Sequence, residues 1–287
     1  MTGTLLSIGH GFSARALAKR LIPQGWTVIG TTRSPEKAEA LRAEGVEPIV
    51  WPGEAIEPAL ERATHLLTSV SPTDDGDPVL LASADAIAAQ ASRIQWAGYL
   101  STTGVYGDHQ GAWVDENTPL TPSTRRGRLR VSAEADWQAL AARSGLPLHI
   151  FRLAGIYGPG RGPFAKVRNG TARRIIKPGQ VFSRIHVDDI AAVLEASINR
   201  PCSGGIYNLC DDDPAPPQDV IAHAATLLGL PIPPETPFDE AEMSPMAKSF
   251  YAESKRVRND RIKTELGVTL KHPDYRSGLA ACLQDEG

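Results

Sequence analysis

The chain has 287 residues, 41% of them hydrophobic, which allows one large domain or two modest ones with a true apolar core. Its 30 basic and 33 acidic residues give a net charge of −3 without a basic tract, so we expect no nucleic-acid partner. No apolar run has the length of a membrane span or a secretory leader, and we therefore expect a cytoplasmic protein without membrane contact.

The first predicted elements are a strand, a tight turn and a helix. An apolar strand at residues 5–8 leads into the segment G-H-G-F-S-A at residues 9–14, which opens a helical apolar stripe. In such a turn the glycines let the backbone approach a pyrophosphate, and the helix N-terminus offers free N–H groups. We predict a dinucleotide site in which Gly9, Gly11, Phe12 and Ser13 contact the cofactor.

The second predicted strand, residues 26–32, indicates which cofactor binds. Thr32, Arg33 and Ser34 stand where an acid would accept hydrogen bonds from the ribose of NAD. An arginine with two neighbouring hydroxyls suits a phosphate monoester, so we expect NADP in preference to NAD. The plainer interpretation of Arg33 is a solvated loop cation. Ser69, near the end of a strand at residues 65–70, is a further expected cofactor contact.

Strand-like and helical runs alternate along the first half of the chain, which is typical of a doubly wound parallel α/β sheet of the Rossmann type. Beyond residue 155 the pattern loosens, and a strand and helix return at 184–198. We predict a Rossmann domain over residues 1–160, to which 184–200 return, and a smaller substrate lobe over 161–183 and 201–287. Further predicted strands are 46–51, 95–101, 148–153 and 206–209, and further helices are 35–43, 79–92 and 127–144.

Several motifs beyond the glycine loop resemble a known family. They are L-S-T-T-G-V-Y-G at 100–107, D-E at 115–116 followed by two prolines, F-R-L-A-G-I-Y-G-P-G at 151–160, and R-I-H-V-D-D-I-A at 184–191. Over nearly its whole length the chain is similar to the extended short-chain dehydrogenases and reductases, also called the NAD-dependent epimerase/dehydratase family. The resemblance implies hydride transfer to or from a nicotinamide cofactor, and a homodimer formed through two helices of the sheet domain.

In that family a Ser or Thr holds a substrate oxygen, and a Tyr-x-x-x-Lys pair moves the proton. The resemblance places this hydroxyl three or four positions before Tyr106, so Thr103 and Thr102 both fit the first role. The relay segment departs from the pattern, since it begins with Arg126 and ends with Arg130, and a guanidinium is not deprotonated in proteins. The chain therefore resembles the atypical branch that lacks the active-site tyrosine.

The two arginines remain candidate catalytic residues. Both lie on the helix face expected to meet the sheet, at the end that points toward the cofactor cleft. Arg130 would then contact the ribose or a phosphate of the cofactor, and Arg126 an anionic substrate. The structural alternative for Arg130 is a surface pair with Glu134, one helical turn further on.

Other polar residues complete the predicted cleft. Tyr106 and Arg184 are candidate substrate contacts, the latter because it shares a strand face with Phe182, which replaces the arginine that grips a nucleotide-sugar phosphate in the family. Tyr157 and His186 are weaker proton donors, because both positions more often pack in the core. A nucleotide-sugar substrate is therefore not expected.

Two functions remain open. The first is an NADP(H)-dependent oxidoreductase or epimerase that acts on a small or anionic carbonyl compound without the usual relay. The second is a non-catalytic NADP(H)-binding sensor whose cofactor-bound surface another protein recognises. Three cysteines without paired spacing and seven histidines without an i, i+4 pair beside an acid lead us to expect neither a disulfide nor a metal site.

Overall fold

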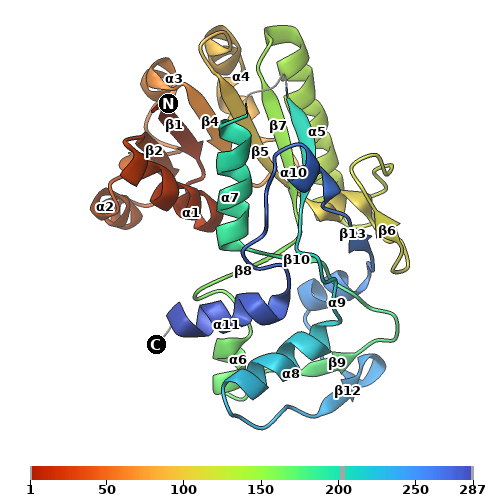
Figure 1. The fold of residues 1–287 in the computed structure, drawn as a ribbon. Helices are drawn as coiled ribbons and strands as arrows, with labels where there is room; N and C mark the ends of the chain where they lie inside the picture. Colours follow the sequence, from red (N-terminus) through yellow and green to blue (C-terminus); the bar gives the residue numbers. More distant parts are fainter. Residues whose placement is uncertain (1, 201–203, 286–287) are drawn as a thin grey trace.

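A computed structural model describes residues 2–200 and 204–285. Within these residues a seven-stranded sheet has the order β11-β7-β5-β4-β1-β2-β3, and all of its neighbouring strands are parallel. Figure 1 shows helices on both of its faces. This arrangement is the predicted doubly wound Rossmann-type sheet. Its strands are β1 (Thr4–Ile8), β2 (Thr27–Thr32), β3 (Glu47–Val50), β4 (His65–Thr68), β5 (Trp96–Thr102), β7 (Leu148–Leu153) and β11 (Gly205–Leu209).

Two apolar layers separate the sheet from its helices. The predicted stripe of α1 is buried on one face together with residues of α2 and α7, and residues of α3, α4 and α5 are buried on the other. Each helix therefore offers an apolar side to the sheet, as an amphipathic helix should. The bounds are α1 (Phe12–Leu21), α2 (Pro35–Ala43), α3 (Glu57–Arg62), α4 (Pro78–Gln90), α5 (Arg125–Ser144) and α7 (Val187–Ile198).

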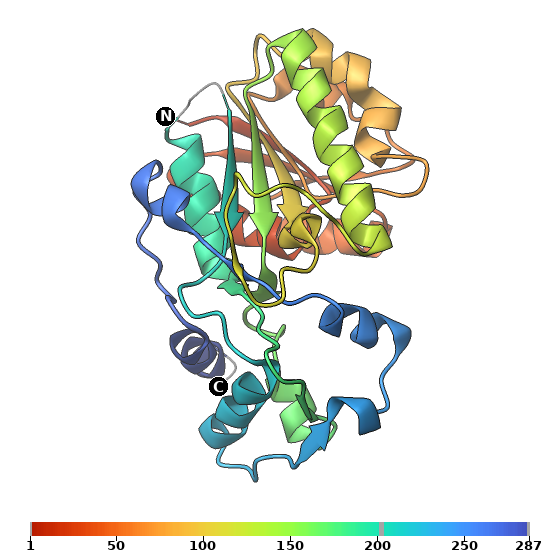
Figure 2. The same cartoon turned by 90° about the vertical axis from the view of Figure 1, so that its right-hand side faces the viewer.

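A smaller group of elements lies beyond the carboxyl ends of the strands, as Figure 2 shows. Residues of α6 (Phe164–Arg168), α8 (Pro217–Leu227) and α11 (Tyr275–Asp285) share a separate apolar cluster. We call these helices, with β9 and β12, the small lobe. The other elements are η1 (Ile22–Gln24), η2 (Thr103–Tyr106), β6 (Trp113–Val114), β8 (Gly155–Tyr157), β9 (Arg174–Ile176), β10 (Arg184–His186), β12 (Glu235–Pro237), η3 (Phe238–Glu240), α9 (Pro245–Tyr251), β13 (Arg256–Val257) and α10 (Asp260–Thr264).

Two segments lie elsewhere than predicted. β11, expected in the substrate lobe, is the edge strand of the main sheet and pairs with β7 along its whole length. β10, expected to return to the main sheet, pairs with β8 instead, and only α7 packs back onto α1. Short strands carry too little periodicity to indicate which sheet they join. None of the helices in the described ranges has both the length and the apolar character needed to cross a bilayer.

Candidate cofactor and substrate site

The glycine loop between β1 and α1 is tightly held. Gly9 has a φ of +81°, which glycine adopts without strain, and a Cβ added there would lie 3.0 Å from Val70. Thr31 of β2 holds the loop through two hydrogen bonds. Its Oγ1 accepts from the N–H of Gly9 (2.8 Å), and its carbonyl oxygen accepts from the N–H of His10 (2.9 Å). Ser69 Oγ donates to the Gly9 carbonyl, so Ser69 shapes the loop.

The start of α1 is open to an anion. Gly11 is exposed and precedes the helix without a side-chain cap, and a Cβ there would have only the Gly9 carbonyl oxygen, at 3.8 Å, within 4 Å. The first-turn N–H groups lack intrahelical partners, so this end fits the pyrophosphate of a dinucleotide. Phe12 lies under the Arg161 guanidinium, 5.4 Å from ring centroid to Cζ, which joins the loop to the segment leading into α6.

Arg33 follows the end of β2 and has no side-chain partner among the described residues. The Arg33 side chain is exposed, and no hydrogen bond or ion pair joins it to another described residue. The two hydroxyls beside it have local roles: Ser34 Oγ caps α2 by accepting from Lys37 N (3.3 Å), and Thr32 Oγ1 accepts from Ser34 N (3.5 Å). Arg33 is therefore the residue of the three that is free to pair with a phosphate.

The two candidate threonines lie where β5 ends. Thr102 Oγ1 accepts from Gly104 N (3.2 Å) and begins the short helix η2, which leaves its own O–H hydrogen available to a ligand. Thr103 is partly exposed, and its hydroxyl bonds to no other described side chain. The first turn of α5 lies against this turn, since a Cβ on Gly127 would be 2.7 Å from the Gly104 carbonyl oxygen. The helix end that carries Arg126 thus adjoins both threonines.

Arg130 ties the ends of two strands together. Its Nη1 donates to the Tyr99 hydroxyl (2.8 Å) and to the carbonyls of Leu100 (3.0 Å) and Val70 (3.3 Å). The guanidinium also lies over the Tyr99 ring, 5.5 Å from its centroid. Arg130 therefore holds the edge of the sheet on which a cofactor would rest. Its predicted alternative, a surface pair with Glu134, is wrong, because Glu134 points into the core.

Glu134 forms a buried ion pair with Arg152 of β7. Arg152 Nη2 lies 2.8 Å from Glu134 Oε2, and the two side chains are only 4% and 2% exposed. Ser101 Oγ donates to the other carboxylate oxygen at 2.5 Å. Arg152 Nη1 donates to the Tyr106 hydroxyl at 3.0 Å, which in turn donates to Asn208 on β11 at 2.7 Å. Sequence reasoning missed this network, because the ion pair depends on how α5 and β7 align.

A pocket of about 520 Å³ lies between the small lobe and α9, within the size range of small-molecule sites. Ala172, Ile175 and Ile221 give it apolar walls, and Lys166 stands at its side with an ammonium that meets no acid among the described residues. Sequence reasoning did not find Lys166, because the lining comes from separate segments. The pocket is lined by Gly162, Pro163, Lys166, Thr171, Ala172, Arg173, Ile175, Ile221, Glu242, Met243, Ser244, Ala247 and Tyr251.

Two segments that line this pocket continue along the chain to other parts of the site. Gly162 follows Arg161, which covers Phe12 of the glycine loop. Tyr251 lies two residues before Glu253, whose carboxylate accepts from Ser123 Oγ (2.5 Å) just ahead of α5. The chain thus connects the pocket lining to the glycine loop and to the segment that contacts the start of α5.

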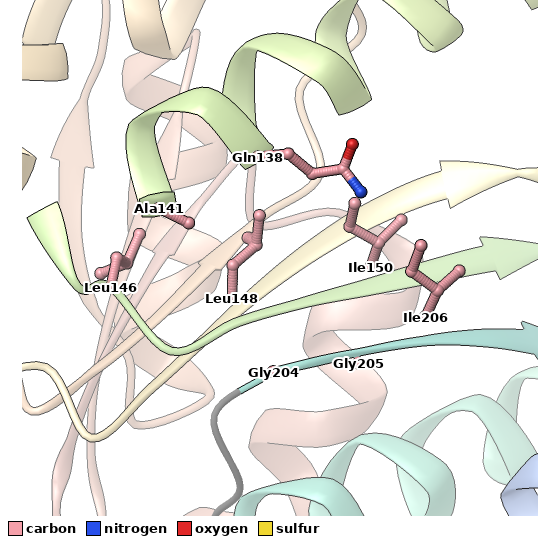
Figure 3. Close-up of a pocket in the computed structure, with 8 residues that line it drawn as sticks. All are labelled: Gln138, Ala141, Leu146, Leu148, Ile150, Gly204, Gly205 and Ile206. Carbon is pink, nitrogen blue, oxygen red and sulfur yellow. The ribbon is translucent and has the colours of Figure 1, made fainter. Parts of the chain in front are cut away.

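A second pocket, of about 190 Å³, lies among α5, β7 and β11 (Figure 3). Its lining comes from α5, from the start of β7 and from the start of β11, whereas the loop lies at the carboxyl ends of the strands. Ligands of open α/β sheets bind at the carboxyl ends. This small hollow is therefore not the candidate site.

Comparison with known proteins agrees with this geometry. The model of the NAD-dependent epimerase/dehydratase family matches residues 83–210. Protein YeeZ of Escherichia coli K12 is 31% identical over 284 residues, which span 93% of this chain and 95% of YeeZ. The chain belongs to the NAD-dependent epimerase/dehydratase family.

Other relatives add detail. A 3-diazoavenalumate denitrifying reductase of a Streptomyces species is 31% identical over 181 residues, 58% of each chain. A solved structure of a functionally unknown conserved protein from Silicibacter pomeroyi is 64% identical, with a TM-score of 0.93 and 99% of both chains covered. UDP-glucuronic acid 4-epimerase from Bacillus cereus, solved with UDP-glucuronic acid and NAD, shares the fold at 16% identity, with a TM-score of 0.78 and coverage of 99% and 100%.

One predicted substrate contact requires correction. Tyr106 is fully buried, with its hydroxyl held between Arg152 and Asn208, and burial raises its pKa to about 12. It therefore belongs to the framework around the site. Arg184 is half-buried: its Nη1 donates to the carbonyls of Phe182 (2.8 Å) and Ala215 (2.9 Å), and burial lowers its pKa. Its contact with a substrate stays a prediction.

We expect Glu134→Ala to destabilise the protein by about 3–5 kcal/mol, because Arg152 would keep a buried charge without its partner. Urea unfolding followed by circular dichroism measures the loss. Glu39→Ala is the matched control, since Glu39 pairs with Arg42 on the surface and its removal should cost less than about 1 kcal/mol. A loss for Glu134→Ala as small as that of the control would contradict the role of the ion pair.

Asp211 generates a prediction about pH. Its carboxylate is buried without a hydrogen-bonding partner for either oxygen among the described residues, and burial raises its pKa from 3.8 to about 8, although the Arg184 charge acts in the opposite direction. Between these values the folded state binds one proton more than the unfolded state, so this group lowers stability progressively as pH rises from about 4 to 8.

Asp211→Asn, which mimics the protonated acid, should therefore stabilise the protein increasingly across that pH range. Thermal unfolding of both proteins at pH 4.5 to 8.5 tests this. A difference in Tm that stays constant with pH would show that Asp211 ionises normally in the folded state.

Proposed function

We propose that this protein is an NADP(H)-dependent oxidoreductase that acts on a small, anionic carbonyl compound without a Tyr-x-x-x-Lys relay. The observation that carries the proposal is the pair of guanidiniums at the relay positions, Arg126 and Arg130, on the helix that starts beside the threonine turn. A pocket whose Lys166 ammonium meets no acid among the described residues adds to it. Positive charge at both positions favours a negatively charged substrate. We retain the division into a Rossmann domain and a substrate lobe as part of this proposal, with β11 placed in the Rossmann domain and β10 outside its sheet.

The cofactor preference rests on the end of β2. Arg33 is exposed and uncommitted, and the two hydroxyls beside it belong to Thr32 and Ser34. A carboxylate at this position would repel a 2′-phosphate, whereas a guanidinium can bind it through two N–H groups. The open start of α1 would hold the pyrophosphate of either cofactor. NADP is therefore preferred, and NAD is the alternative that the family name suggests.

The pocket beside α9 supports the substrate class. Its apolar walls suit a hydrocarbon or aromatic body, and the Lys166 ammonium suits a carboxylate. Arg173 lines the same pocket and donates one hydrogen bond to the Glu242 carbonyl (3.0 Å), so its other N–H groups remain for a ligand. The Streptomyces relative is named a 3-diazoavenalumate denitrifying reductase, which agrees with a reductase activity.

The reaction would divide its tasks among different groups. Bound NADPH would supply a hydride to the carbonyl carbon. Thr102 or Thr103 would donate a hydrogen bond to the carbonyl oxygen, and Arg126 would stabilise the negative charge that develops there. Because an arginine does not release its proton, the alkoxide would take one from water and leave hydroxide to the solvent. Arg130 holds the ends of β4 and β5 in position and does not enter the proton transfer.

The second candidate function is a cofactor-binding sensor without turnover. The same replacement of the tyrosine and lysine by arginines favours it, because no side chain at the threonine turn can both give and regain a proton at neutral pH. The two functions differ in one observable. An enzyme consumes NADPH when a suitable carbonyl acid is supplied, and a sensor only binds it.

A panel of aromatic and aliphatic keto and aldehyde acids, followed by the loss of NADPH absorbance, tests for turnover. With any substrate so found, Arg126→Ala should lower kcat by about 100-fold, as the removal of one group that stabilises an oxyanion does, and leave the Kd for NADPH unchanged.

Arg125→Ala is the matched control, because Arg125 pairs with Asp74 on the surface, and its activity should stay near that of the wild type. Equal activity of the Arg126→Ala variant and the wild type would remove Arg126 from the mechanism. NADPH binding without turnover on any compound of the panel would favour the sensor.

A further inference from the structure

Two imidazoles and a carboxylate converge where α7 begins. His186 ends β10, Asp188 lies in the first turn of α7, and His272 belongs to the segment that precedes α11. Asp188 Oδ2 is 3.9 Å from His186 Nδ1 and 3.7 Å from His272 Nε2, and one ligand atom from each residue lies within 4.8 Å of the others. Figure 1 shows α11 crossing beside the start of α7. We call these three residues the His–Asp cluster.

One atom of the cluster has no partner. His272 is 4% exposed, and its Nε2 is buried without a hydrogen bond to any described residue while it faces the Asp188 carboxylate. Leaving a buried polar nitrogen unpaired costs free energy, so such an atom in a native structure requires an explanation. A bound cation would supply the missing partner.

His186 has one ring lone pair, on Nδ1, and a metal ion would have to displace the backbone hydrogen bond that this lone pair now accepts. Its Nδ1 accepts from the backbone N–H of Asp188 (3.2 Å), which requires an unprotonated Nδ1 and places the ring proton on Nε2. That proton points to Cys282 Sγ, 3.3 Å away on α11. A histidine that binds a metal is commonly oriented in this way, through a hydrogen bond from its second nitrogen.

We propose that the His–Asp cluster binds a divalent transition-metal ion of the Zn²⁺ class. Two neutral imidazoles and one carboxylate are ligands that such ions prefer, and water would complete the coordination. Ligand atoms about 2.1 Å from a tetrahedral ion lie about 3.4 Å apart. The two distances from Asp188, 3.7 and 3.9 Å, must therefore shorten by a few tenths of an ångström, and the two imidazole nitrogens, within 4.8 Å of each other, must also approach. Asp188 is 40% exposed and has room to make this adjustment.

A lysine competes for the same carboxylate. Lys271 Nζ lies 3.0 Å from Asp188 Oδ2, and the positive end of the α7 dipole also opposes a cation. The lysine side chain is 69% exposed and can move into solvent when the metal binds. Its charge therefore weakens the site without blocking it, and removal of this charge should tighten metal binding.

Bound metal would join two segments that are distant in the sequence. It would hold the start of α7, which packs on the Rossmann sheet, to the residues that lead into α11 of the small lobe. The role is structural, because the cluster includes none of the residues proposed for cofactor or substrate. Metal binding should raise Tm, since the unfolded chain lacks the preformed site.

The test uses the full-length, tag-free protein, stripped with a chelator and titrated calorimetrically with Zn²⁺, and separately with Co²⁺ followed by visible absorbance. We expect one ion per chain, a visible Co²⁺ spectrum of histidine ligation and a rise in Tm with Zn²⁺. His272→Gln and Asp188→Asn should each weaken binding by about tenfold or more, whereas Lys271→Ala should strengthen it several-fold.

His223→Gln is the control, because His223 lies in the small lobe with its ring against Tyr275 and outside the cluster, and it should leave binding unchanged. Circular dichroism identifies a variant that fails to fold, and the exposed Lys271→Ala variant tests the site even in that event. The proposal is overturned if the stripped protein binds neither ion, or if neither Asp188→Asn nor Lys271→Ala alters the affinity.

Discussion

The site depends on one buried ion pair, between Glu134 of α5 and Arg152 of β7. Both charges are almost fully excluded from water, so each requires the other as its partner. The ion pair therefore fixes the rotation of α5 about its axis and its position along the central strands. Ser101 and Tyr106 join the same network and fix the end of β5 and the turn after it. The threonine turn and the start of α5 therefore hold a defined relative position.

That position is the basis of the proposed site, in which arginines stand at the relay positions. Arg130 holds the ends of β4 and β5 through the carbonyls of Val70 and Leu100, and Arg126 lies one turn away at the exposed start of the helix. A positively charged helix start beside the threonine turn favours substrates that bring negative charge. The proposed anionic substrate follows from this charge.

Much of the fold could be predicted from the sequence, because the glycine loop and the alternating strands are local patterns. The Glu134–Arg152 pair, the burial of Tyr106 and the place of β11 in the main sheet could not, because each depends on contacts between distant segments. For the same reason the sequence did not predict the His–Asp cluster, because its two histidines lie far apart in the chain. The cofactor contacts of Gly9, Gly11 and Arg33 stay predictions until a bound cofactor is observed.

Calorimetric titration of the protein with NADPH and with NADH tests the central claim most directly, with Arg33→Asp measured in parallel. The account predicts that the wild type binds NADPH more tightly than NADH, and that the variant loses this preference because a carboxylate repels the 2′-phosphate. Equal affinities in the wild type, or an unchanged ratio in the variant, would contradict the assignment of Arg33. Binding of neither cofactor would contradict the account of the glycine loop itself.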